Sequence, residues 1–253
     1  DSAPTSNSLI VVNKKTNKSK VVDYNNIYEA DTSSYYTTGS TSYTGYDCEG
    51  QLDSAISYVL SDKNPVVYRI TGHDEIGMGS KFSDAISKMN CDVEEIKLAS
   101  MDSLSVDDCE MIMILGPTKD YSKDEAQKVI DYLNAGGKAI IACEAYKSAQ
   151  TDKPNFESIL EAFGVKVVEG VIAENDTDFY SNQYGPFFTF ANGSGSFASG
   201  IDNYIIAPYA KGLQQANKDD SSITYTSLAT TSKAVSKTHL KSAKKYTKED
   251  GDV

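Results

Sequence analysis

Between residues 48 and 170 the sequence alternates amphipathic helical stripes with short apolar runs, and no other feature restricts the fold as much. Apolar residues at helical spacing form each stripe, and a run rich in Val and Ile follows most of them. Such alternation is typical of a parallel sheet with right-handed crossovers. We therefore predict an α/β fold built on a doubly wound parallel sheet, with helices on both faces. The expected strands are residues 66–70, 93–98, 110–115, 138–143 and 165–168, and the expected helices begin near residues 52, 82, 123 and 154.

Local signals indicate where some of these elements begin, end or lie. Ser122 and Glu125 have the spacing of a capping box, and the glycine pair 136–137 is a typical helix stop. Ser80 is expected to cap the helix that starts near residue 82. The almost wholly apolar run 110–115 predicts a strand that is covered on both faces. The more charged strand 93–98 is expected nearer the edge of the sheet.

The two ends of the chain have a different character from its centre. Residues 9–12 and 20–22 predict an N-terminal β-hairpin, and residues 31–46 consist of Ser, Thr, Tyr and Gly after the leading Asp, which predicts a loop or linker. The C-terminal third has weaker patterns and a lysine-rich tail. We predict three parts, and they are listed here: residues 1–47 (hairpin and linker), 48–175 (doubly wound α/β domain) and 176–253 (smaller α+β region, with possible strands at 204–207 and 223–226).

Charge and hydropathy exclude two classes of function. The chain has 24 Lys and Arg against 36 Asp and Glu, a net charge of −12, which is the wrong sign for neutralising nucleic-acid phosphates. A transmembrane helix needs roughly 20 apolar residues, and the longest apolar runs here are about five. The sequence also begins without Met and ends without a clear element, so we expect it to be a piece of a longer protein.

Ligands of open parallel sheets bind outside the carboxyl ends of the strands. Three loops leave those ends, at residues 71–75, 116–120 and 144–147. We call this edge the rim. Its candidate binding residues are Gly72, His73, Asp74, Glu75, Gly116, Pro117, Asp120 and Glu144.

The rim residues do not specify a reaction. A hydrolase or transferase could use Cys143 as its nucleophile and His73 as its base, but Cys143 lacks flanking glycines, and Glu144 would raise the pKa of its thiol. Carboxylates of the rim could hold a hard cation, yet no calcium-loop pattern is present. The loop 71–77 matches no nucleotide-binding motif. We therefore predict no catalytic residues, no metal and no cofactor, and we expect the cysteines (Cys48, Cys91, Cys109 and Cys143) to be free.

Five segments together resemble a known family. They are residues 47–59, 67–75 (ending in Gly72-His-Asp-Glu75), 114–117 (Ile-Leu-Gly-Pro), 121–125 (Tyr-Ser-Lys-Asp-Glu) and 132–141. Their order and spacing are similar to those of the extracytoplasmic auxiliary subunits of ABC transport systems, related to the gliding-motility-associated ABC transporter proteins. The resemblance runs from about residue 8 to residue 237 and is strongest over residues 47–170.

The resemblance implies a non-catalytic, membrane-associated accessory protein that binds a partner subunit or a solute. Its partners would be the ABC permease and ATPase of the same system, on the extracytoplasmic face of a bacterial membrane, with transmembrane segments outside this sequence as the tether. The central domain would have a flavodoxin-like or class I amidotransferase-like fold without the catalytic residues. The family's usual Gly-His-Gly-Glu reads Gly72-His-Asp-Glu75 here, and Asp74 lacks the backbone freedom of glycine. A stand-alone solute-binding protein is the remaining alternative, although the C-terminal third is short for a second lobe.

Overall fold

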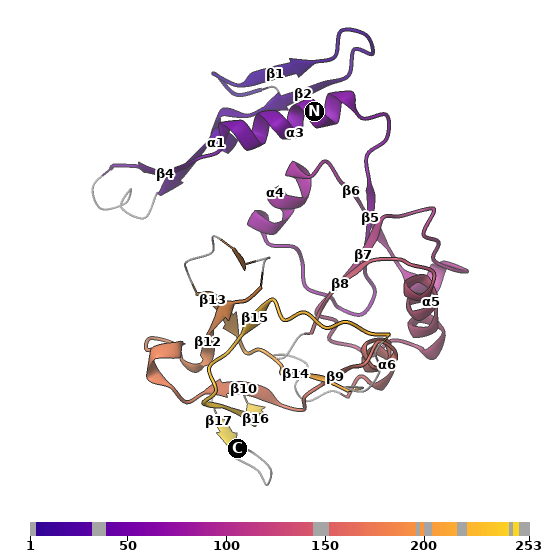
Figure 1. Cartoon of the computed structure of the whole chain (residues 1–253), viewed down its shortest axis with the longest axis vertical. Helices are drawn as coiled ribbons and strands as arrows, with labels where there is room; N and C mark the ends of the chain where they lie inside the picture. Colours follow the sequence, from indigo (N-terminus) through magenta and orange to yellow (C-terminus); the bar gives the residue numbers. More distant parts are fainter. Residues whose placement is uncertain are drawn as a thin grey trace. The chain divides into compact units, whose positions relative to one another are not determined.

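The computed structural model describes residues 4–31, 39–143, 152–195, 198–199, 204–216, 222–242 and 245–247. The chain forms two compact units (Figure 1). Unit 1 comprises Asp1–Val67 and Met78–Val93, and unit 2 comprises Tyr68–Gly77 and Glu94–Val253. The division into residues 1–47, 48–175 and 176–253 remains a prediction.

The described residues of unit 1 form two antiparallel strand pairs and three helices. The strands are β1 (Leu9–Val12) with β2 (Ser19–Val22), and β3 (Tyr28–Asp31) with β4 (Ser42–Tyr46), and the helices are α1 (Tyr24–Ile27), α3 (Cys48–Leu60) and α4 (Ser80–Lys88). Helix α3 packs against the β1–β2 pair, and Val22, Ile27 and Ala55 form the buried core between them.

Two expectations for unit 1 are wrong in detail. Residues 31–46 were expected to be a loop or linker, but their described part contains strand β4 and the last residue of β3. Tyr and Thr favour strands. The ring of Tyr28 packs against those of Tyr43 and Tyr46, and these contacts between neighbouring strands stabilise the β3–β4 pair. Helix α4 is preceded by Gly79 in the N-cap position, and Ser80 is its first helical residue.

A parallel sheet of four strands forms the centre of the fold. Its strands are β5 (Val66–Ile70), β6 (Asp92–Ile96), β7 (Met111–Leu115) and β8 (Ala139–Ala142), in the order β6-β5-β7-β8. The interior position of β7 and the edge position of β6 are as predicted. The charged residues of β6 lie at an edge, whereas four of the five β7 residues are buried. The α/β class and the parallel sheet are confirmed, while the covering of both faces by helices remains a prediction.

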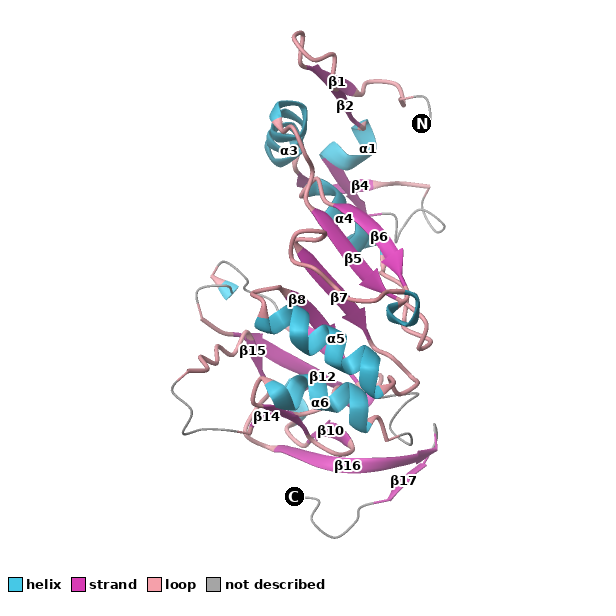
Figure 2. Cartoon of the chain, turned by 90° about the vertical axis from the view of Figure 1, so that its right-hand side faces the viewer, coloured by secondary structure: helices cyan, strands magenta, loops and turns pink. Residues whose placement is uncertain are grey.

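Helices α5 (Lys123–Asn134) and α6 (Pro154–Ala162) pack against each other in unit 2 (Figure 2). The capping box at the start of α5 is confirmed, because the Ser122 hydroxyl accepts the Glu125 N–H and the Glu125 carboxylate accepts the Ser122 N–H. After α5 the chain turns at Gly136, which has a positive φ of 95° that glycine adopts without strain. Helix α6 has Pro154 in its first turn, as expected.

The part of the chain after α6 forms antiparallel sheets. Strand β9 (Val165–Val167) pairs with β14 (Leu213–Gln215), so the expectation that residues 165–168 join the parallel sheet is wrong. The backbone hydrogen-bonding groups of β9 pair with those of β14, a segment that comes much later in the chain. Local sequence periodicity cannot predict such a partner. The remaining strands are β10 (Val171–Glu174), β11 (Tyr180–Ser181), β12 (Gly185–Gly193), β13 (Ile205–Pro208), β15 (Ala229–Thr230), β16 (Val235–Ser242) and β17 (Lys245–Thr247).

Two further expectations concern this C-terminal part. Strand β13 matches the expected strand at 204–207, but residues 223–226 are not a strand, and the Tyr225 hydroxyl instead donates to the Gly164 carbonyl. The predicted α+β character is not seen either. The described residues after 176 contain strands and short 3-10 turns such as η2 (Thr177–Phe179), but no α-helix.

The strand order fixes where a site is expected. In chain order the four parallel strands lie 2-1-3-4, so the direction of winding reverses between β5 and β7. The loops that leave the carboxyl ends of strands on either side of such a reversal diverge and leave a crevice. Here these are residues 71–77 after β5 and residues 116–122 after β7.

Candidate functional site

The loops after β5 and β7 are joined directly by backbone hydrogen bonds. The N–H groups of Thr118 and Lys119 both donate to the His73 carbonyl, at 3.0 and 3.1 Å, and the Ile76 N–H donates to the Leu115 carbonyl at 2.9 Å. Both loops belong to unit 2. The structure thus places two of the three predicted rim loops side by side, whereas Glu144 and its loop lie outside the described residues.

His73 is the centre of a nearly buried cluster. Its Nε2 lies 3.3 Å from Glu125 Oε2 and its Nδ1 lies 3.5 Å from Glu75 Oε1. The side chain of His73 is 12% exposed, and those of Glu75 and Glu125 are 2% and 8% exposed. The imidazole also packs on the Tyr121 ring, with centroids 4.1 Å apart. We call His73, Glu75, Tyr121 and Glu125 the His73 cluster.

Glu75 is held by two donors besides its approach to His73. The His73 backbone N–H donates to Glu75 Oε2 at 2.8 Å, and the Tyr121 hydroxyl donates to Oε1 at 3.2 Å. Burial of the phenol, reinforced by the neighbouring carboxylate, raises the pKa of Tyr121 well above its usual range. Tyr121 is therefore a neutral hydrogen-bond donor and cannot act as a base near neutral pH.

Glu125 belongs both to the His73 cluster and to the start of α5. Burial alone would raise the pKa of Glu125, but hydrogen bonds from the N–H and hydroxyl of Ser122, together with His73, lower it overall. The carboxylate is thus ionised at neutral pH and is already engaged. His73 Nδ1, in contrast, finds no hydrogen-bond partner among the described residues, since 3.5 Å from Glu75 is too long for a good bond.

Asp120, a predicted rim residue, binds the start of helix α6. Its carboxylate accepts from the N–H groups of Asn155 and Phe156 and from the Asn155 side-chain amide at 2.8 Å. It therefore caps α6 from a loop that lies 35 residues earlier in the chain. Close by, the buried Lys153 ammonium donates to the Pro117 carbonyl at 2.8 Å. These contacts join the β7 loop to the start of α6.

Replacing Asp120 by Ala should lower the free energy of unfolding by about 2 kcal/mol, because three donors at the start of α6 lose their acceptor. Asp120→Asn keeps one oxygen and should cost less. Urea denaturation followed by circular dichroism measures both variants. Asp124→Ala is the matched control, since this carboxylate is 76% exposed and pairs with Lys128 one turn later, so a change of about 0.5 kcal/mol is expected. Equal losses for Asp120→Ala and Asp124→Ala would show that the cap does not contribute.

The remaining predicted rim residues are structural or exposed. Gly72 and Gly116 have φ of 125° and 58°, conformations that suit glycine. Asp74 has φ of 54°, so it adopts the left-handed conformation that glycine adopts without strain, and Asp is among the few other residues that tolerate it. Its exposed carboxylate lies 2.9 Å from Lys119 Nζ. Asp74 therefore points away from the buried cluster that its neighbours form.

Cys143 follows β8 and is half-buried. Burial raises the pKa of its thiol, and the opposing influence of Lys211 and Lys153 is too weak to reverse this. Both imidazole nitrogens of His73 face carboxylates of the His73 cluster. The shift in the pKa of Cys143 is opposite to the lowered pKa that activates a catalytic thiol. All four cysteines are free thiols.

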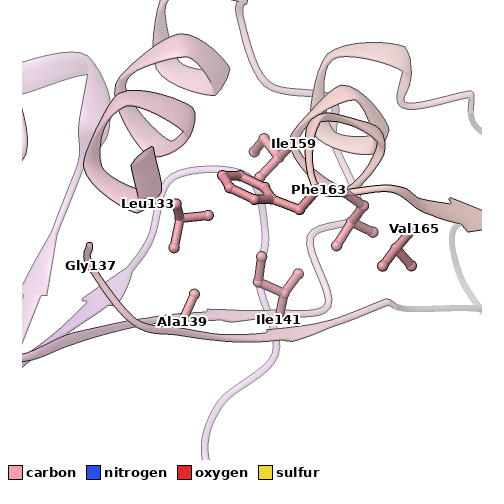
Figure 3. Close-up of a pocket in the computed structure, with 8 residues that line it drawn as sticks. Leu133, Gly137, Ala139, Ile141, Ile159, Phe163 and Val165 are labelled. Carbon is pink, nitrogen blue, oxygen red and sulfur yellow. The ribbon is translucent and has the colours of Figure 1, made fainter. Parts of the chain in front are cut away.

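A separate cavity of about 350 Å³ lies where α5, β8 and α6 meet (Figure 3). The side chains of Leu133, Ile159 and Phe163 from the two helices point toward Ala139 and Ile141 on the strand. None of the lining side chains can form a hydrogen bond, so the cavity offers no side chain to orient a polar ligand. Among the residues that the structure describes, no group of His, Cys, Asp or Glu is arranged to hold a metal ion.

From the sequence, we selected the two loops that the structure joins, and we included His73 and Glu75 but not the other two members of the cluster. Glu125 was recognised only as part of a capping box, and Tyr121 only as part of a family string. One signal for Glu125 was available. It is the carboxylate of a capping box, and it lies ten residues after the end of β7, close to the predicted edge of the sheet. Nothing in the local pattern distinguishes Tyr121, which faces inward, from Asp120, which faces α6.

Comparison with known proteins places this geometry in a family. A family model described as "ABC-type uncharacterized transport system" (ABC_transp_aux) matches residues 64–243, which include the parallel sheet and the His73 cluster. No curated protein matches the sequence. The solved structure titled "mmIFT52 N-terminal domain" is similar, with 16% identity, a TM-score of 0.47, and 60% of this chain and 69% of that chain covered. Within the described part of the chain, no helix has both the length and the hydropathy of a membrane span. Because the family model matches well over half of its residues, the chain belongs to the auxiliary (ABC_transp_aux) family of ABC-type transport systems.

Proposed function

We propose that this protein is a non-catalytic accessory subunit that binds a partner subunit or a solute for an ABC transporter. Membership of the auxiliary family supports a role in such a system. The observation that carries the non-catalytic part is the state of the His73 cluster: its carboxylates, imidazole and phenol contact one another and the start of α5. Side chains that contact one another in this way stabilise the two loops, which supports a structural role for the cluster.

The partners we propose are the permease and ATPase subunits of the same system. The location we propose is the extracytoplasmic face of a bacterial membrane, with a tether outside the sequence given, and a relation to the gliding-motility transporters. The 2-1-3-4 strand order supports a flavodoxin-like centre, since that fold winds its first strands in the same order. The rim formed by the two joined loops is the part of unit 2 best placed to contact a partner.

A thiol-dependent hydrolase or transferase remains the competing hypothesis, and Cys143 decides between them. The raised pKa of its thiol argues against a reactive thiolate at neutral pH. A stand-alone solute-binding protein would need two similar lobes, and the antiparallel sheets after α6 do not repeat the parallel sheet.

Co-purification with the transporter tests the proposal. The chain, immobilised by a terminal tag, should retain the permease–ATPase complex of its own system reconstituted in nanodiscs, and it should not retain an unrelated ABC complex. Adding the chain should change the ATPase rate of its own complex only. In parallel, the chain and its Cys143→Ser variant would be assayed on a panel of amide and ester substrates. Failure to bind the transporter, or turnover that disappears with Cys143→Ser, would contradict the proposal.

A further inference from the structure

Unit 1 contains a cavity of about 650 Å³ that the proposed function does not use. Its walls come from β2, α1, β3, β4, α3 and α4, all in the indigo-to-magenta part of Figure 1. Small-molecule sites commonly have volumes of about 300–1,000 Å³, so the size suits a ligand of a few sugar-sized rings. Of the lining residues only those on α4 fall within the stretch that the family model matches. We call this cavity the tyrosine pocket.

Three tyrosine rings define one side of the tyrosine pocket. Tyr28 is central and half-buried, with ring centroids 5.4 Å from Tyr24 and 5.2 Å from Tyr43. The Tyr24 and Tyr43 side chains also interact with each other, and this interaction raises the pKa of Tyr24. Tyr43 is 61% exposed. An exposed ring that is held by two others offers a preorganised apolar face beside polar hydroxyls.

The charges around the tyrosine pocket cancel. Its three lysines are matched by three carboxylates, from Glu29, Asp47 and Asp84. Lys88 Nζ lies 2.6 Å from Asp47 Oδ2. Lys81 Nζ lies 3.5 Å from Glu29 Oε1. In a chain with a net charge of −12, a pocket with balanced charge suits a neutral ligand better than an anion or a cation.

The rest of the lining is rich in amides. Asn25 and Asn26 on α1 are exposed, and Gln51 on α3 donates to Asp47 Oδ2 at 2.9 Å. An amide both donates and accepts, so it can pair with a hydroxyl in either direction. Exposed aromatic faces with amides and carboxylates around them are complementary to a sugar ring, which has C–H groups on its faces and hydroxyls on its edge.

We propose that the tyrosine pocket of unit 1 binds a neutral oligosaccharide, with one sugar ring against Tyr43 and the hydroxyls bonded to the amides of α1. The proposal is independent of the rim and of the partner subunits. It concerns a different unit and a different set of residues, so failure of either proposal leaves the other standing.

Calorimetric titration of the full chain with cellotetraose, maltotetraose and tetra-N-acetylchitotetraose tests this inference. At least one of them should bind, and Tyr43→Ala should weaken that binding by about tenfold, since a stacked ring is lost. Tyr46→Ala is a closely matched control. Tyr46 lies on the same strand, is similarly exposed at 67% and contacts Tyr28 at the same 5.2 Å, but it does not line the pocket. It should leave the affinity unchanged.

Saturation-transfer NMR on the unmodified chain provides a measurement that needs no variant. The bound sugar should receive saturation from tyrosine ring protons. The inference is overturned if none of the three sugars binds, or if Tyr43→Ala and Tyr46→Ala weaken binding equally. It is also overturned if deca-proline or the anionic tetragalacturonate binds in preference, because the pocket would then be a peptide site or an anion site.

Discussion

Replacing His73 by Ala should lower the free energy of unfolding by about 3 kcal/mol at pH 7, because it leaves two nearly buried carboxylates facing an empty space. Glu75 and Glu125 are 2% and 8% exposed, so water cannot fully replace the imidazole. His73→Gln keeps an amide donor and should recover part of the loss. Urea denaturation measures the free energy of unfolding of the unmodified protein and of both variants. Asp74→Asn is the control: its side chain is 62% exposed and its left-handed backbone suits Asn, so it should change stability by less than about 0.5 kcal/mol.

The effect of His73→Ala should also depend on pH. The pKa of Glu125 is lowered in the folded protein, so its ionisation stabilises the fold above the usual value of 4.5, and that stabilisation is lost as the pH falls through the lower folded value. His73 is one source of this lowering. The His73→Ala variant should therefore lose less stability than the unmodified protein when the pH falls. The difference between the two proteins should therefore be constant at neutral pH and shrink as the pH falls below 4.5. A difference that stays constant below this pH as well would show that the carboxylates are not the cause.

Replacing Ile114 by Ala should cost about 2–5 kcal/mol, the second large effect, because it creates a cavity in the interior strand of the parallel sheet. Ile114 is 0% exposed on β7. Ile140 on the neighbouring strand β8 is the matched control, with the same side chain but 38% exposure, so Ile140→Ala should cost about 1 kcal/mol or less. Urea denaturation followed by amide circular dichroism compares the two. Similar losses at both positions would contradict the interior placement of β7.

The sequence was most informative where a pattern is completed locally. The capping box of α5 involves residues three apart, and the almost wholly apolar sequence of β7 is enough to predict that the strand is buried. Both expectations are confirmed. Strands β9 and β4 were misjudged because their environment depends on distant partners: β14 for β9, and β3 with the Tyr28 ring for β4. A strand's sequence indicates that it can pair, but not with which strand.

For the candidate site, too, the sequence predicted the location but not the direction in which each side chain points. The rule that ligand sites lie outside the carboxyl ends of parallel strands was enough to select the loops after β5 and β7. It could not show that Tyr121 turns toward His73 while the adjacent Asp120 turns toward Asn155. That choice depends on where the start of α6 lies in space relative to the loop after β7, which only the folded chain determines. The tyrosine pocket was not predicted, because its rings come from three separate elements and Tyr43 lies in a stretch that was predicted to be a linker.

The cap that Asp120 provides for α6 affects the order in which this half of the molecule assembles. A helix capped by its own neighbouring residues can form as soon as it is synthesised, as α5 can with Ser122. The first turn of α6 must instead wait until the loop after β7 has reached its final position. Closing such a long loop slows contact formation. Helix α6 should therefore mature late, and the antiparallel strands that follow it in the chain should dock onto a sheet that has already formed.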